Sequence, residues 1–343
     1  MTATEWVASL SPWPEEFGLG RMHALLAALD NPQRAYRSVH VVGTNGKSTA
    51  TRTIAALLRA SGLAVGAYTS PHVSGWHERL DTDPEAFERA VARVRAPAEV
   101  VGATQFETLT AAAFADFAER KVDAAVVEAG LGGRLDATNV LDAPVVLLTN
   151  VGLEHTDVLG DTREKIAAEK LAVAGPRATV VLPDDEWRAQ VPGRRIVVGG
   201  AREAASAFVG HAVDGDVEVS LPGRLERRGP DEVRDGAHTP EAVDWLLARL
   251  EPRRWTIVAS ILRDKDADAM LSRLAAAGPR LIATRSSNAR ALDESGLAAR
   301  AEPYFDHVEA VPDPADALAK AREYGPVLVT GSLYLLADLH DSR

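Results

Sequence analysis

Residues Val39–Arg52 read VHVVGTNGKSTATR, a strand-like apolar run, a glycine-rich turn and the start of a helix. Glycines let backbone N–H groups converge on phosphate oxygens, and a helix start with a lysine adds positive potential. The usual Walker pattern needs a glycine at position 41, but this chain has Val41, and its first glycine is Gly43. A plain turn capping the helix through Ser48 is the alternative. Strand, glycines, Lys47 and hydroxyls together favour a variant phosphate-binding loop.

Composition restricts the kinds of protein this chain can be. Its 343 residues suggest two or three domains, and 46% hydrophobic with 25% charged residues is ordinary for a soluble globular protein. The absence of cysteine excludes disulfides and thiolate metal sites. A formal net charge of −11 disfavours a nucleic-acid partner. Without a signal-peptide pattern or a long apolar run, we expect no membrane span and a cytoplasmic location.

Short apolar runs alternate with helical patterns in the first half of the chain. This alternation predicts βαβ units and a parallel sheet. The predicted strands are 38–43, 64–70, 123–130 and 143–152, and the predicted helices are 47–61, 106–120 and 162–174.

The remainder divides into two parts. Residues 178–221 contain three short β-like pieces, TVVL, RIVVG and DVEVSL. A stretch rich in Pro, Gly and charge, 221–232, then predicts a domain boundary near residue 225. Beyond it a second α/β series begins, with predicted helices at 241–250, 266–278 and 314–325 and strands at 255–260, 280–286 and 326–332.

Polar side chains follow two of the predicted strands. Glu128 ends the strand before GLGGR, while His155 follows the next strand in TNVGLEHTD. Ligands of open α/β sheets bind at the carboxyl ends of the strands. Glu128 could cap a turn, and His155 could be a solvated loop residue. Beside a phosphate loop, however, metal binding or activation of water is the better interpretation of Glu128, with His155 as a possible Mg²⁺ ligand.

Two further stretches carry polar chemistry. The loop YTSPHVSGWHERL, 68–80, contains Ser70, His72 and Arg79, which spacing alone does not distinguish from solvated surface residues. Lys170 lies among apolar residues in AAEKLAVA, and periodicity alone would place it on a solvated helix face beside Glu169.

Taken together these stretches resemble the folylpolyglutamate synthase and dihydrofolate synthase branch of the Mur ligase superfamily. The resemblance covers about residues 19–338 and rests on motifs in the same order: LGRM, VVGTNGKST, YTSPHV, FETLTAAAF, VVEAGLGGRLDATNV, TNVGLEHTDVLG, IAAEK, PGRLE, DGAHTPEA, DKD and VLVTGSLYLLAD. It implies a P-loop-type parallel-sheet ATP-binding domain, 1–223, followed by a smaller Rossmann-like α/β glutamate-ligase domain, 224–343.

The resemblance also implies an activity. ATP would phosphorylate a folate-type carboxylate, dihydropteroate or a folylglutamate, and the amine of L-glutamate would attack the acyl phosphate, releasing ADP and phosphate. The implied partners are these small molecules and Mg²⁺, with no nucleic acid and no membrane, and we expect a monomer.

The resemblance assigns roles to residues of both halves, with the two domains expected to close over ATP. The expected catalytic residues are Lys47, Glu128, His155 and Lys170, with Lys170 as a carbamate. The expected ATP-binding residues are Gly43, Thr44, Asn45, Gly46, Lys47, Ser48, Thr49, Arg224, Asp235 and His238. The expected metal ligands are Ser48, Ser70, Glu128 and His155, and His72 and Arg79 are expected to bind the substrate.

This chain departs from the family pattern at three places. The residue after the loop lysine is Ser48, where the branch usually has glycine, so a hydroxyl is available for a metal. Thr239 stands where asparagine is usual, and 198–221 is short and lacks the asparagine that helps to seat adenine. Two alternatives therefore stay open: a related ligase acting on a non-folate carboxylate, and a nucleotide-binding homologue without catalysis. A peptidoglycan ligase is disfavoured, because little chain precedes the first predicted strand.

Overall fold

The computed structural model describes residues 1–341 as two compact units. The first comprises Met1–Ser70 and Trp76–Val219, and the second comprises Pro71–Gly75 and Ser220 onwards. The division after Val219 lies close to the predicted boundary at 223/224, but Pro71–Gly75 groups with the second unit. In the described part of the chain no helix is long and apolar enough to cross a membrane.

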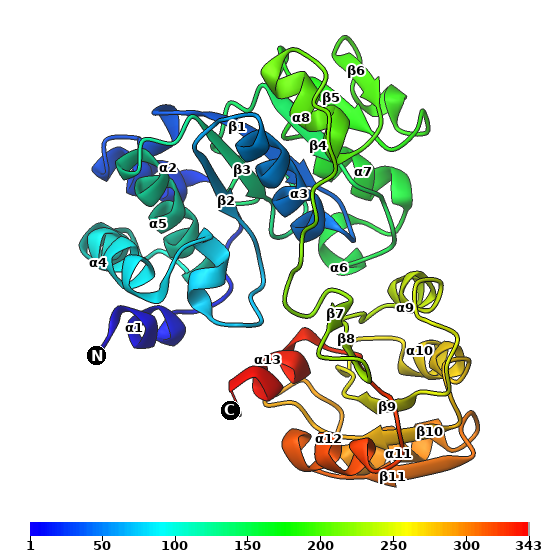
Figure 1. Ribbon diagram of the computed structural model, residues 1–343. Helices are drawn as coiled ribbons and strands as arrows, with labels where there is room; N and C mark the ends of the chain where they lie inside the picture. The colour runs from blue at the N-terminus through cyan, green and yellow to red at the C-terminus, as the bar shows by residue number, and fades with distance from the viewer. Residues whose placement is uncertain (342–343) are drawn as a thin grey trace. The chain divides into compact units, whose positions relative to one another are not determined.

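The first unit is built on a six-stranded parallel sheet with the order β2-β3-β1-β4-β5-β6 (Figure 1). The central strands are buried on both faces, which is why they read as continuous apolar runs. The strands are β1 (Arg37–Val42), β2 (Val65–Tyr68), β3 (Ala124–Glu128), β4 (Val145–Leu148), β5 (Thr179–Leu182) and β6 (Arg195–Val198).

Helices cover both faces of this sheet. On one face α3 and α8 pack together against β1, β3 and β4 through Ile54, Leu57 and Phe208. On the other, α5 lies over β2 and β3, and α7 lies over β4 and β5. The helices are α1 (Ala3–Ser9), α2 (Gly20–Ala28), α3 (Lys47–Ala60), α4 (Pro84–Val101), α5 (Gln105–Glu119), α6 (Thr156–Leu159), α7 (Arg163–Leu171) and α8 (Ala201–Val209), with 3₁₀ turns η1 (Pro32–Arg34), η2 (Trp76–Leu80) and η3 (Arg188–Gln190).

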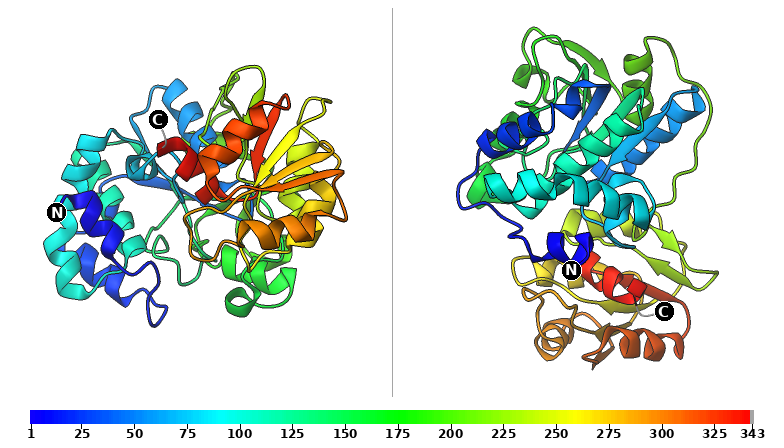
Figure 2. Two further views of the ribbon diagram at one scale, coloured as in Figure 1. Left: turned by 90° about the horizontal axis from the view of Figure 1, so that it is seen from below. Right: turned by 90° about the vertical axis from the view of Figure 1, so that its left-hand side faces the viewer.

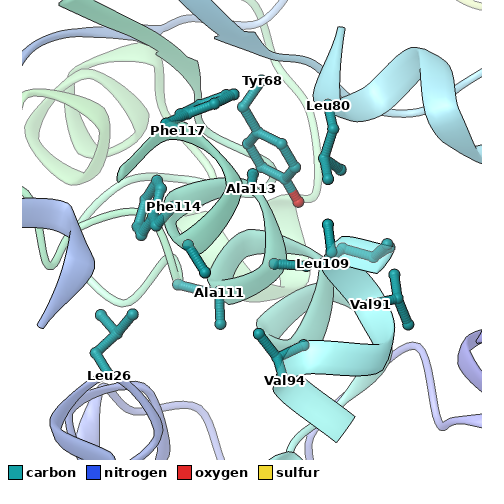
Figure 3. Packing of buried hydrophobic residues seen from close by; sticks show 14 of the residues in the cluster. Leu26, Tyr68, Leu80, Val91, Val94, Leu109, Ala111, Ala113, Phe114 and Phe117 are labelled. Carbon is teal, nitrogen blue, oxygen red and sulfur yellow. The ribbon is translucent and has the colours of Figure 1, made fainter. Parts of the chain in front are cut away.

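Helix α5 forms the centre of the largest apolar cluster of this unit (Figure 3). It is almost entirely buried because α1, α2, α4 and the sheet surround it. The ring of Tyr68 packs here at the end of β2, and its hydroxyl accepts a hydrogen bond from Thr110 Oγ1 (3.1 Å). Thr104 caps the helix, and the Glu107 carboxylate accepts a hydrogen bond from the Thr104 N–H.

The second unit has its own six-stranded sheet, with the order β11-β10-β9-β12-β8-β7, in which only β7 is antiparallel among the described strands. Helices α9, α10 and α11 cover one face and α12 and α13 the other; Figure 2 shows α11 and α12 on opposite sides of the sheet. Its elements are β7 (Glu226–Arg227), β8 (Glu232–Arg234), α9 (Pro240–Leu247), β9 (Thr256–Ala259), α10 (Ala267–Leu274), β10 (Arg280–Ala283), α11 (Glu294–Ala301), β11 (His307–Ala310), α12 (Pro314–Arg322), β12 (Val327–Thr330) and α13 (Leu333–Asp341).

The α/β class and the elements predicted around the phosphate loop are confirmed. One β-like piece is not a strand: DVEVSL, 216–221, alternates in polarity, but only Leu221 forms a β-bridge, an isolated one with Arg224. Its apolar residue Val217 packs instead against the cluster that contains α8. The alternation of polar and apolar residues here reflects a segment that is partly buried against this cluster without being paired in a sheet.

Candidate active site

The phosphate loop connects β1 to α3 and is shaped by its glycines. Gly43 has φ 149°, and a Cβ there would lie 1.9 Å from Thr149 Oγ1, so a side chain cannot fit. Gly46 is the N-cap of α3 in the left-handed region, φ 79°. Lys47 folds back over the loop, where its Nζ donates to the carbonyl oxygens of Gly43 (3.0 Å) and Thr44 (3.1 Å). The amino end of α3 and this ammonium thus concentrate positive potential at one place.

The segment after β4 holds the loop from the side. Asn150 accepts from the loop twice: its carbonyl oxygen from the Thr44 N–H (3.1 Å) and its Oδ1 from the Asn45 N–H (2.9 Å). Thr149 Oγ1 donates to the Asn45 carbonyl oxygen (2.7 Å). Thr149 and Asn150 were not predicted as site residues, although both follow the end of β4.

Glu128 ends β3 and is buried, with 2% of its surface exposed. Ser48 Oγ donates to its Oε1 (3.1 Å), and the main-chain N–H of Ser70 donates to its Oε2 (3.0 Å). One carboxylate therefore links the first turn of α3 to the loop after β2. The structure thus brings together Ser48, Ser70 and Glu128, which the sequence had placed at three separate strand ends.

Lys170 lies on α7 and is also buried, with 1% of the surface of the whole residue exposed. Its Nζ donates to Glu154 Oε1 (2.5 Å) and to the Gly43 carbonyl oxygen (2.9 Å), so it touches the phosphate loop. Burial lowers the pKa of the Lys170 ammonium; Glu154 opposes that shift and the charge of Lys47 adds to it. The pKa of Glu154 is lowered although burial raises it, because Lys170 and Lys47 outweigh burial.

The glycine-rich segment after Glu128 packs against α7. A Cβ on Gly133 would lie 2.6 Å from the carbonyl oxygens of both Glu169 and Lys170, so only glycine allows this approach. The Arg134 N–H donates to the Glu169 carbonyl oxygen (3.0 Å), and the Arg134 side chain pairs with Glu169 Oε1 (2.9 Å). The Glu169 side chain therefore pairs with Arg134 at the surface, whereas the side chain of Lys170 points into the protein.

Comparisons with known proteins show the family of this chain. Residues 41–209 match the Mur ligase middle domain and residues 223–333 the Mur ligase glutamate ligase domain. The chain is 32% identical to the folylpolyglutamate synthase of Lacticaseibacillus casei, over 98% of this chain and 97% of that protein. The chain belongs to the folylpolyglutamate synthase family of Mur ligases.

Two solved structures extend the similarity to three dimensions. The Mycobacterium tuberculosis folylpolyglutamate synthase complexed with ADP and AMPPCP has a TM-score of 0.87 at 29% identity, covering 95% of this chain and 96% of that one. The bifunctional folylpolyglutamate synthase/dihydrofolate synthase of Yersinia pestis, complexed with AMPPNP and a Mn ion, has a TM-score of 0.85 at 25% identity, covering 100% and 98%.

This Mur ligase is shorter than the L. casei protein over the aligned range. The alignment with the L. casei protein spans 426 positions, whereas the present chain has 343 residues, so at least 83 positions (426 less 343) fall opposite gaps. The segment after β6 contains one helix, α8.

The three residues expected to bind ATP from the second unit lie near one another in sequence and structure. Asp235 follows β8 and accepts from the Leu225 N–H (2.7 Å) and the Ala237 N–H (2.9 Å), and burial raises its pKa. His238 Nδ1 lies 2.7 Å from the Gly236 carbonyl oxygen, and Arg224 donates to Gly223 (3.2 Å). Asp235 therefore fixes the turn that carries Arg224; nucleotide binding by these residues and by the loop stays a prediction.

The remaining predicted residues belong to different segments of the chain. Arg79 is mostly buried, with its guanidinium 5.2 Å from the centre of the Trp76 ring, whereas His72 groups with the second unit. His155 is exposed and occupies the N-cap position of α6, with φ 45°. In residues 1–341 no group of three or more acidic or histidine side chains converges on a metal position. Magnesium binding by Ser48, Ser70, Glu128 and His155, and substrate binding by His72 and Arg79, therefore stay predictions.

Two further side chains connect segments around the site. Glu154 is the partner of Lys170, but its position 16 residues earlier in the chain gives no periodic signal. Arg52 on α3 forms ion pairs with Asp81 and thereby ties the helix to the turn after η2. Both contacts arise between segments that only the fold brings together.

Proposed function

We propose that this chain is an ATP-dependent ligase that adds L-glutamate to a folate-type carboxylate through an acyl phosphate. One observation carries the proposal: the Lys47 loop, Glu128 and Lys170 meet at the carboxyl ends of β1 and β3, linked by the Ser48–Glu128 and Lys170–Gly43 hydrogen bonds. That is the edge where α/β sheets bind ligands. The family membership and the relatives' names support the substrate class.

In this proposal the loop acts on the phosphates of ATP. The N–H groups of Thr44 and Asn45 already bind Asn150, so the main-chain donors for a phosphate come from the first turn of α3. Lys47 supplies a charge that can move from its two carbonyl partners to a phosphate. Phosphoryl transfer depends mainly on positioning and charge neutralisation, so no nucleophilic side chain is required. The acceptor carboxylate attacks the γ-phosphorus, ADP leaves, and the amine of glutamate then displaces phosphate.

The oxygen atoms around Glu128 suit Mg²⁺, which prefers carboxylate and hydroxyl ligands and keeps several waters. Glu128 and Ser48 would hold the ion, with Ser70 and His155 as further proposed ligands. Bound there, Mg²⁺ would neutralise charge on the phosphates. The manganese ion in the Y. pestis structure supports a divalent metal in this family.

We propose further that Lys170 acts as a carbamate. A carbamate forms when a neutral lysine amine adds to CO₂ and releases a proton, and the lowered pKa of Lys170 favours the neutral amine. The product is an anion beside the phosphate loop, where Lys47 provides a positive charge. Burial protects such a group from water, because the Lys170 side chain is only 2% exposed.

The second unit is proposed to supply Arg224, Asp235 and His238 to the nucleotide and to be the glutamate-ligase domain, while His72 and Arg79 contact the acceptor. A monomeric state and a cytoplasmic location also stay predictions. The two alternatives, a non-folate acceptor and a non-catalytic homologue, are distinguished from the leading proposal by one assay.

The assay measures ADP release from ATP with L-glutamate and a panel of acceptors: dihydropteroate, tetrahydrofolate and its glutamate-extended forms. Release that depends on one of these acceptors and on glutamate supports the proposal and names the substrate. ATP binding without release with any acceptor would contradict it and favour the non-catalytic homologue. The same assay is repeated with carboxylates that are not folates. ADP release with these acceptors alone would favour the non-folate ligase.

A further inference from the structure

A chain of buried polar groups runs beside the phosphate loop and has no part in the proposed chemistry. His40 lies on β1, three residues before Gly43, and is completely buried. Its Nε2 lies 2.8 Å from Thr138 Oγ1, and Thr138 Oγ1 in turn hydrogen-bonds Asp136 Oδ1. Thr138 and Asp136 are buried as well. Burying three polar side chains is unfavourable unless they form hydrogen bonds, so these three groups depend on one another for their stability.

Asp136 organises the segment that follows Glu128. Its Oδ2 accepts from the N–H groups of Gly130 (3.0 Å) and Leu131 (2.8 Å), and its Oδ1 accepts from the Thr138 N–H (2.9 Å). The segment 129–139 therefore winds around one carboxylate. Burial raises the pKa of Asp136, and these hydrogen bonds oppose the shift.

The direction of the hydrogen bonds follows from the number of protons. Thr138 has one hydroxyl proton, and it goes to Asp136 when that carboxyl group is ionised. His40 must then donate from Nε2 to Thr138. In a neutral ring this leaves Nδ1 unprotonated, and Nδ1 has no hydrogen-bond partner within residues 1–341. Burial lowers the pKa of His40 to about 4, which agrees with a neutral ring.

The segment held by Asp136 touches two groups of the candidate site. It starts at Glu128, which binds the Ser48 hydroxyl, and through Gly133 it packs on the main chain of Lys170. His40 thus connects the strand that carries the phosphate loop to the segment that seats Glu128 and Lys170. A displacement of 129–139 would disturb the chain directly after Glu128 and the contact with the main chain of Lys170.

We propose that His40 is a positioning residue for the ligase reaction, acting through Thr138 and Asp136 to hold Glu128 and Lys170 in register with the phosphate loop. This inference rests on the proposed function for its effect on turnover. The linkage itself is a property of the fold and can be measured without turnover.

The test uses three variants and a control in the full chain. Thr138→Val removes the shared hydroxyl at nearly constant volume, and His40→Leu removes the ring nitrogens. His40→Gln retains an N–H donor for Thr138. The control is Thr108→Val, because Thr108 Oγ1 is also completely buried in this unit but has no hydrogen-bond partner among the described residues.

Three results are expected. Thr138→Val and His40→Leu lower kcat, and raise the Mg²⁺ concentration for half-maximal rate, by about 10-fold or more. The KM for ATP changes less, and His40→Gln restores part of kcat. Thr108→Val leaves kcat, the Mg²⁺ concentration for half-maximal rate and the KM for ATP close to those of the wild type. Equal losses in Thr138→Val and Thr108→Val, or no rescue by His40→Gln, would overturn the positioning role.

A spectroscopic measurement separates this inference from the ligase proposal. In ¹⁵N-labelled protein at pH 7, His40 should show a neutral ring with the proton on Nε2, and Thr138→Val should shift the Nε2 resonance while Thr108→Val does not. A charged ring, or a proton on Nδ1, would overturn the linkage whatever the activity. A wild-type protein with the expected spectrum but no ligase activity would refute the proposed function alone.

Discussion

The Nζ of Lys170 lies 2.5 Å from Oε1 of Glu154 and 2.9 Å from the carbonyl oxygen of Gly43. A lysine that periodicity would place on a solvated helix face thus reaches the phosphate loop from inside the protein. Its helix neighbour Glu169 pairs instead with Arg134.

Replacing Lys170 by alanine should abolish most of the ligase activity. Because the variant loses the group proposed to become an anion beside the loop, we expect kcat to fall by at least about 100-fold. Short carboxylates such as acetate, which can enter the space left by the side chain, should restore part of the rate in steady-state ADP release.

Lys165→Ala is the matched control, because Lys165 is on the same helix but exposed and paired with Asp161. It should retain nearly full activity. Turnover of Lys170→Ala equal to that of wild type would contradict the carbamate assignment.

Ser48→Ala tests the hydroxyl of the residue that follows the loop lysine. Loss of the Ser48–Glu128 hydrogen bond and of a proposed metal ligand should raise the Mg²⁺ concentration for half-maximal rate by about 10-fold, while kcat at saturating Mg²⁺ changes less. Titration of Mg²⁺ in the ADP-release assay measures this. Ser61→Ala, at the exposed end of the same helix, should leave the titration unchanged; identical titrations for all three proteins would argue against the metal contact.

Gly133→Ala should disturb the contact between the glycine-rich segment and α7. The added methyl group would lie 2.6 Å from two main-chain carbonyl oxygens, which cannot move without shifting the segment or the helix. We expect a loss of about 1–3 kcal/mol in the free energy of unfolding and a lower kcat. Gly175→Ala, where the nearest atom is 3.5 Å away, is the control; urea unfolding curves that coincide for the two variants would refute the steric argument.

His40 should make stability depend on pH. Its pKa is lowered to about 4 in the folded protein, while the unfolded chain retains the ordinary value of 6.5. Between these values the unfolded state binds a proton that the folded state does not, so stability falls as pH falls from 6.5 towards 4, by up to about 1.4 kcal/mol per pH unit. His40→Gln lacks this contribution.

Urea unfolding at pH 7, 6 and 5 measures the difference in slope between wild type and His40→Gln. His23→Gln removes an exposed histidine and should follow wild type. A His40→Gln curve parallel to wild type over this range would show that His40 is not buried as a neutral ring.

Much of the candidate site was predictable because its residues stand at strand ends. The strand before Gly43 and the helix from Lys47 are signalled by apolar runs and glycines, and Glu128 by its place after a buried run. Partners were not predictable in the same way. Asn150, Glu154 and Thr138 each act on a segment distant in sequence, and a polar residue in a loop does not indicate which distant group it meets.

The sequence by itself determined the α/β class, the phosphate loop and the family resemblance, because hydrophobic periodicity and glycine-rich turns are local properties. Only the tertiary structure decided that Lys170 faces inward to Glu154, that Glu128 joins Ser48 to Ser70, and that His40 reaches Asp136 through Thr138. The physical reason is that parallel strands adjacent in the sheet are separated in the chain by helices. Their ends meet only after the sheet order β3-β1-β4 is formed.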